Sequence, residues 1–214
     1  MTVERIRGHA IAVLAAGLVL GTAAPVSAQY FGRNKVQYER FDFRILHTDH
    51  FDFHYYPEEE EAVRDAARMG ERWYARLARV FNHSFAEVKP IILYANHPDF
   101  QQTNTTSTNL GEGTGGFTEA LKNRVVMPLT GVYRDTDHVL GHELVHAFQY
   151  DIAEDMAALN QQGLGSLPGW LIEGMAEYLS VGREDTHTAM WLRDAALRGD
   201  LPTFRQLSTD PRYF

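Results

Sequence analysis

The sequence contains no cysteine among its 214 residues. This absence excludes disulfide bridges, thiolate metal sites, a cysteine nucleophile and lipid attachment through an amino-terminal cysteine. Any bound metal ion must therefore be held by histidine, aspartate or glutamate. Low-complexity tracts and linkers rich in proline, glycine or serine are also missing, so we expect residues 29–214 to form one domain.

Basic residues are few, because 20 lysines and arginines stand against 28 aspartates and glutamates, a formal net charge of −8. This acidic balance disfavours nucleic acid as the main partner. Hydrophobic residues make up 44% of the chain and aromatic residues 12%, which indicates a globular protein with a core rather than a disordered chain.

Long apolar runs are confined to the amino-terminal end of the sequence. Arg5 and Arg7 precede an uncharged run at 10–20, and small residues follow it. This pattern predicts a secretory signal peptide, 1–28, cleaved before Gln29. The alternative is an uncleaved anchor, but the run is too short to cross about 30 Å of hydrocarbon. We therefore expect an exported protein, periplasmic or extracellular, with no membrane span after cleavage.

Hydrophobic periodicity predicts strands before helices. Segments 40–46 and 50–56 alternate apolar and polar residues, which is typical of a hairpin with one buried face. Acidic residues from Glu58 begin a predicted helix that ends near Asn82. Its apolar stripe consists of Trp73, Leu77, Val80 and Phe81.

Two further strands are predicted at 88–94 and 124–129, on either side of a polar loop and a glycine-rich segment. From Asp135 onward the pattern is helical. Because strands come first and helices later, the predicted class is α+β, with a small mixed sheet followed by a mainly helical carboxy-terminal part.

The first of these later helices contains His142-Glu143-Leu-Val-His146. Two histidines four residues apart project from one face of a helix, where their imidazoles can bind one divalent cation. Such a cation lowers the pKa of water toward ~7, and an adjacent glutamate can accept the proton. The pattern indicates a catalytic zinc site with Glu143 as general base. Two histidines and a glutamate satisfied by hydrogen bonds alone are the structural alternative.

A catalytic zinc ion normally has three protein ligands. A third histidine six residues after the motif is absent, since Ile152 occupies that position. Glu173 and Glu177 share one face of an apolar helix that begins near Pro168, where two carboxylates need a positive partner. Zinc would supply it for Glu173, and Glu177 could accept the second ring N–H of a ligating histidine. Other carboxylates nearby are Asp151, Glu154 and Asp155.

The segments HELVHAFQY and WLIEGMAEY together resemble the gluzincin metallopeptidases, in particular the peptidase MA-like group. The resemblance implies a zincin-like fold, one zinc ion per chain held by His142, His146 and Glu173, and a peptide or protein substrate. It also implies that substrate pairs with a sheet edge, for which 115–119 and 124–127 are candidates, with an ordinary hairpin turn as the alternative.

The start of the mature sequence resembles exported bacterial proteins in which a peptidase-like domain precedes a TolB-like β-propeller. The resemblance implies a β-propeller partner domain beyond Phe214, and a catalytic domain at 29–214 that continues past this end. Peptide hydrolysis also needs a donor to the developing oxyanion. Tyr178 is a candidate, with simple packing as its alternative, and a donor beyond Phe214 is the other option.

Other histidines are interpreted without a metal. His138 lies one turn before His142 and is read as a surface residue or a partner of a ligand. His47, His50 and His54 are read as ordinary hairpin positions. The sequence thus predicts an exported zinc metallopeptidase. The alternatives are a catalytically inactive zincin-fold binding module of the cell envelope and a metal-free structural domain.

Overall fold

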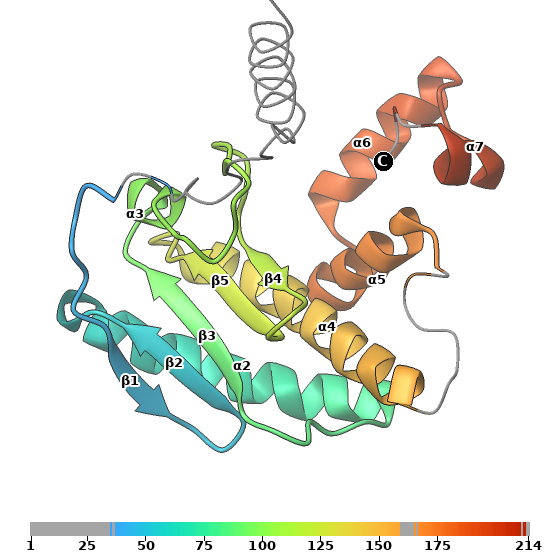
Figure 1. Ribbon diagram of the computed structural model, residues 1–214. Coiled ribbons are helices and arrows are strands. Elements are labelled where there is room, and N and C mark those ends of the chain that lie inside the picture. Colours follow the sequence, from blue (N-terminus) through green and yellow to red (C-terminus); the bar gives the residue numbers. More distant parts are fainter. Residues whose placement is uncertain (1–34, 36, 159–164, 166, 211, 213–214) are drawn as a thin grey trace, which may run out of the picture. The chain divides into compact units, whose positions relative to one another are not determined.

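A five-stranded mixed sheet organises the chain. The structure is a computed structural model that describes residues 35, 37–158, 165, 167–210 and 212. The strand order is β1-β2-β3-β5-β4 (Figure 1). The predicted signal peptide, 1–28, lies outside the described residues. The strands are β1 (Arg44–His47), β2 (Phe51–Tyr55), β3 (Lys89–Tyr94), β4 (Phe117–Glu119) and β5 (Arg124–Pro128).

The three inner strands β2, β3 and β5 are parallel, while β1 and β4 pair antiparallel at the two edges. The helices are α2 (Glu60–Phe81), α3 (His97–Gln101), α4 (Tyr133–Ala158), α5 (Gly169–Val181), α6 (Thr186–Arg198) and α7 (Phe204–Thr209), and a 3-10 turn, η1 (Pro57–Glu59), precedes α2. Among the described residues, no helix has both the length and the apolar character needed to cross a bilayer.

The expected hairpin forms, but its first strand is shorter than the alternation suggested. It begins at Arg44, and Phe41 instead leaves the sheet edge and stacks on Tyr56, with ring centroids 5.0 Å apart. The predicted apolar stripe of α2 also fails at one position, because Val80 is 53% exposed. Near the end of α2 the core lies on the side of Phe81, which stacks on Phe148 of α4.

The helix expected between the hairpin and the next strand is α2, which begins at Glu60 and ends at Phe81. Helix α2 connects the parallel strands β2 and β3, because parallel neighbours need a crossover that a short turn cannot provide. The sheet is mixed, and helices α2 and α3 alternate with its strands in the first half of the chain. Strand β5 is also an inner strand, so 124–127 is not a sheet edge, and β4 alone forms that edge.

Helices α2 and α4 cover one face of the sheet and form the main core with it (Figure 1). Fully buried side chains from the sheet and from both helices meet there, among them Phe53, Leu77, Leu144 and Phe148. A smaller aromatic cluster around Tyr94 and Phe100 lies on the other face. The main core therefore buries one side of α4 and leaves its other side available for a site.

A glycine allows α4 to approach α2 closely just before the histidine motif. A Cβ atom on Gly141 would lie 2.5 Å from Cε2 of Trp73 on α2. The indole N–H of Trp73 in turn donates to Oδ1 of Asp137, at 2.9 Å. This contact sets the position of the first histidine, because His142 follows Gly141 directly.

Candidate metal centre

The polar face of α4 carries the histidine motif. Leu140, Leu144 and Ala147 are fully buried on the opposite side of the helix. His142 and His146 therefore point away from the sheet, toward α5. Helix α5 packs along α4 through the buried Ala176 and the half-buried Leu179, and it brings Glu173 to the two rings.

Three ligand atoms converge between α4 and α5. The Nε2 atoms of His142 and His146 are 3.2 Å apart. Oε2 of Glu173 lies 3.4 Å from the first and 3.3 Å from the second. Ligands at about 2.0 Å from a tetrahedral zinc ion are separated by roughly 3.3 Å, so the three atoms occupy the corners that such an ion requires.

The outward nitrogen of each ring has an acceptor. Nδ1 of His142 lies 3.2 Å from Oε2 of Glu177, and Nδ1 of His146 lies 2.8 Å from Oε1 of Gln149. A carboxylate and an amide oxygen accept hydrogen bonds, so these contacts favour the tautomer in which each neutral ring carries its proton on Nδ1. The lone pairs of both Nε2 atoms are then free for a metal ion.

Gln149 is a residue that the sequence reasoning missed. Its side chain is buried, and its amide nitrogen donates to the backbone carbonyl of Ile172, at 3.1 Å. Because Ile172 precedes Glu173 directly, one amide ties His146 on α4 to the backbone that carries the predicted carboxylate ligand. The available signal was its position three residues after His146, which places both on neighbouring turns of one helix.

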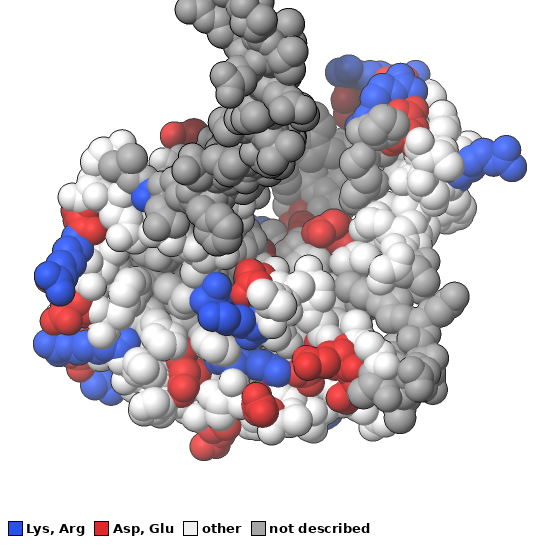
Figure 2. All heavy atoms as spheres, viewed as in Figure 1, with Lys and Arg blue, Asp and Glu red and all other residues white. Residues whose placement is uncertain are grey.

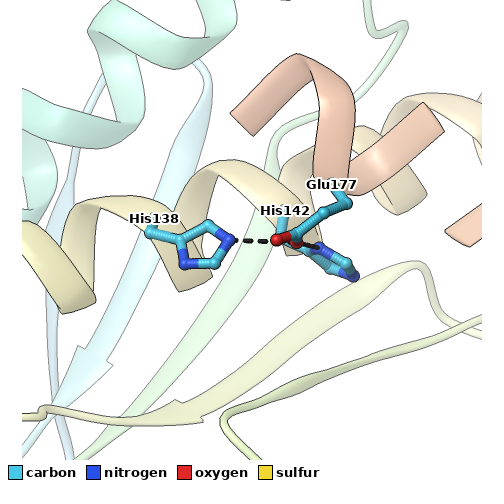
Figure 3. Close-up of side chains that lie close together, drawn as sticks. All are labelled: His138, His142 and Glu177. Atoms are coloured by element: carbon cyan, nitrogen blue, oxygen red, sulfur yellow. Dashed lines mark hydrogen bonds and ion pairs between the residues drawn. The ribbon is translucent and has the colours of Figure 1, made fainter. Parts of the chain in front are cut away.

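A second group of potential ligands adjoins the first. Nε2 of His138 lies 3.1 Å from Oε2 of Glu177, the same oxygen that His142 contacts (Figure 3). His138, His142 and Glu177 have the spacing of a metal site, as do His142, His146 and Glu173. A neutral His142 can ligate through only one nitrogen, so the two groups cannot both be filled while its Nδ1 is protonated.

Glu143 lies beneath the three ligand atoms. Its side chain is buried, and the Thr118 hydroxyl of β4 lies 2.8 Å from its Oε2 and 2.9 Å from its backbone carbonyl oxygen. Burial raises the pKa of the Glu143 carboxyl, while the neighbouring His146, Thr118 and His142 act in the opposite direction. Thr118 is a second partner that the sequence reasoning did not identify.

A cleft of about 520 Å³ opens above this centre. One wall is the glycine-rich segment 113–116 with β4, and the other is formed by α4 and α5. Gly116 lies so close to α4 that a Cβ atom there would be 3.3 Å from Cγ of Glu143. Figure 2 shows acidic and basic side chains interspersed over the face in view, without an extended patch of either sign among the described residues.

Two tyrosines lie differently with respect to the cleft. Tyr178, the candidate named from the sequence, is 58% exposed and does not line it. Tyr150, one turn after His146 on α4, does line it. Burial raises the pKa of the Tyr150 hydroxyl, and the negative charges of Glu173 and Glu143 raise it further.

The remaining candidates lie away from the centre. Asp151 is buried against Lys89 and His83, whose Nε2 is 2.7 Å from its Oδ2. Glu154 and Asp155 are exposed. In the hairpin, His47 pairs with Asp52 and His50 with Glu71, each at 2.6 Å, and no cluster of three ligands forms there among the described residues. Of the five carboxylates near the motif, only Glu173 and Glu177 reach it.

Comparison with known proteins supports a peptidase-like family for the part of the chain that carries this centre. A family described as BSP, peptidase of plants and bacteria, matches residues 120–198. This range begins before β5, includes the histidine motif and both glutamates, and ends with α6. No curated protein and no solved structure matches the chain.

Proposed function

We propose that this protein is an exported zinc metallopeptidase of the gluzincin type, in which His142, His146 and Glu173 bind one zinc ion. The observation that carries the proposal is the mutual spacing of their ligand atoms, 3.2–3.4 Å, and each ring has an acceptor at its Nδ1. Similarity to a peptidase family at 120–198 supports peptide hydrolysis as the reaction. The predicted signal peptide supports export to the periplasm or the exterior.

The zincin-like fold is part of the same proposal. The mixed sheet, its antiparallel edge strand β4 and helix α4 beneath the cleft support this part of the proposal. An extended peptide can add to the free edge of β4 through backbone hydrogen bonds. The glycines beside β4 let this wall of the cleft approach α4 closely, because a Cβ atom on Gly116 would lie 3.1 Å from Cγ1 of Val139.

Each residue of the centre has its own role in the proposed reaction. When bound, zinc supplies a Lewis acid that acidifies water and polarises a peptide carbonyl. Glu143 accepts a proton from the water whose oxygen bonds to the carbonyl carbon. The C–N bond then breaks, and Glu143 gives the proton to the leaving amine. Thr118 orients Glu143 during both transfers, while Glu177 and Gln149 keep the two rings in place.

The test combines metal content with peptide cleavage in three variants. Wild type is expected to hold about one zinc ion per chain and to cleave members of a fluorogenic peptide library. Glu143→Gln should keep the zinc and lose cleavage. Glu173→Ala should lose zinc affinity by more than about 100-fold, since a ligand is removed rather than its partner. Glu184→Gln, an exposed glutamate outside the cleft, is the matched control.

Two results would contradict the proposal in different ways. Zinc binding by wild type without cleavage of any library peptide, and without an effect of Glu143→Gln, would favour the catalytically inactive binding module. Absence of bound zinc in wild type, with no change in stability on adding a chelator, would favour a metal-free structural domain.

A further inference from the structure

Peptide hydrolysis places negative charge on the carbonyl oxygen of the substrate, and a positioned hydrogen-bond donor stabilises that charge. The donor is the part of the machinery that the proposed function leaves unassigned, and the inference below rests on that function. Among the described residues that line the cleft there is no lysine or arginine. The side chains there that can donate are two histidine ligands and four others: Thr114, Thr118, His138 and Tyr150.

Two of these four donors are already engaged. The hydroxyl of Thr118 contacts Glu143, and Nε2 of His138 contacts Glu177. Thr114 belongs to the glycine-rich wall, and its short side chain lies on the β4 side of the cleft. Tyr150 has no hydrogen-bond partner for its hydroxyl among the described residues, although the side chain is partly buried.

Tyr150 is also placed where a donor is needed. It follows His146 by four residues on α4, so its ring lies beside that ring, with centroids 6.5 Å apart and planes tilted by 30°. It shares the cleft with Glu143 and Glu173, and the charges of both carboxylates act on its hydroxyl. The helix that carries it is fixed by the main core, so the hydroxyl belongs to a rigid wall.

We infer that the Tyr150 hydroxyl is a catalytic group that donates a hydrogen bond to the carbonyl oxygen of the scissile peptide bond as negative charge develops on it. The hydroxyl keeps its proton throughout, so the proton transfers of Glu143 are unchanged. Its contribution is larger in the transition state than in the bound substrate, because the oxygen accepts more strongly when it is charged.

Tyr150→Phe tests the inference, because it removes one oxygen atom that has no partner in the described structure. Tyr178→Phe is the matched control, since that ring lies on α5 outside the cleft. We expect Tyr150→Phe to lower kcat by about 100- to 1,000-fold, the range found when one oxyanion donor is removed. KM, zinc content and melting temperature should stay at the wild-type values, and Tyr178→Phe should match wild type throughout.

A second readout does not depend on turnover. A phosphonate analogue of a cleaved library peptide carries a charged oxygen where the oxyanion would form. Its affinity for the zinc-loaded protein should fall in Tyr150→Phe by a factor similar to the loss in kcat, while the affinity of the cleavage product should not change.

The outcomes separate this inference from the proposed function. An active wild type whose kcat equals that of Tyr150→Phe overturns the role of Tyr150 and leaves the peptidase in place. Loss of zinc from Tyr150→Phe also overturns it, because the residue would then act on the metal centre instead of on the substrate. A wild type that holds zinc and cleaves no peptide overturns both.

Discussion

The two sides of the candidate metal centre are built differently. The α4 side belongs to the main core: the side chain of His146 is 10% exposed, and its partner Gln149 is buried. The α5 side is open, because the side chains of Glu173 and Glu177 are 53% and 42% exposed. The histidine pair is thus carried by a helix of the folded core, while the position of the third ligand depends on how α5 packs against α4.

This difference assigns separate tasks to the two helices. Packing against the sheet and α2 fixes α4 whether or not a metal ion is bound. Helix α5 has a single fully buried side chain, Ala176, so its own contacts hold it less firmly. A metal ion that joins Glu173 to both histidines would add a link where packing contributes least.

Removing the metal should have the largest effect, and the effect should be concentrated on α5. At free zinc about 1,000-fold above its Kd, binding raises the free energy of unfolding by about 4 kcal/mol. A chelator should therefore lower the melting temperature and reduce hydrogen-exchange protection in α5 before it does so in α4. Equal loss of protection in both helices would contradict the comparison. Glu173→Ala should show no zinc-dependent shift.

A glycine in each helix gives the next test. Gly141→Ala puts a methyl group against Trp73, and we expect a loss of about 1–3 kcal/mol from overpacking. Gly174→Ala is the matched change on α5, where no atom lies within 4 Å of the added Cβ. It should be neutral or stabilise by up to about 1 kcal/mol, because alanine favours the helix. Urea denaturation of both variants measures the difference, and equal destabilisation would show that α5 is packed as tightly as α4.

The partners of the two histidines can be compared directly. Gln149→Leu and Glu177→Leu each remove an acceptor from a ring, and each should weaken zinc binding by about 10- to 100-fold. Gln149→Leu should also lower stability in the apo protein, because the partly buried backbone carbonyl of Ile172 loses the Gln149 amide as a donor. Zinc titration with a competing chelator and thermal unfolding give the two quantities. A normal affinity in Gln149→Leu would exclude it as the partner of a ligand.

The smallest effect is expected at His138. His138→Ala removes one of two rings that contact Glu177, but His142 keeps its acceptor. We expect about one zinc ion per chain in both wild type and the variant, with a change in affinity below about tenfold. A stoichiometry of two in wild type that falls to one in His138→Ala would instead assign a second metal site to His138 and Glu177.

Much of the local structure was predictable, because it depends on short-range patterns. Alternation predicted β2, and acidic residues after a proline predicted the start of α2 within two residues. The parallel pairing of β2 with β3 was not predictable in this way. The crossover through α2 places strands far apart in sequence side by side, and no local periodicity encodes which strands become neighbours.

In the candidate metal centre, too, some features follow from local sequence patterns and others depend on tertiary packing. The spacing of His142 and His146 places them on one face of a helix, and this follows from 3.6 residues per turn. The position of Glu173 was inferred from a resemblance and from unpaired carboxylates on an apolar helix. Gln149, Thr118 and Tyr150 were not identified, because an amide, a hydroxyl and a ring have no spacing rule that distinguishes a functional position from a structural one.

Residue order along α4 therefore sufficed to name the histidine pair and Glu143, since helical geometry is local and repeats along the chain. Which groups meet is a property of packing. The contact of Gly141 with Trp73 fixes the position of α4 against α2. The packing of α5 on α4 then brings Glu173 within 3.4 Å of the rings of His142 and His146. Burial beneath β4 gives Glu143 a raised pKa and Thr118 as its partner. These relations join segments that lie far apart in the chain, so only the three-dimensional structure could reveal them.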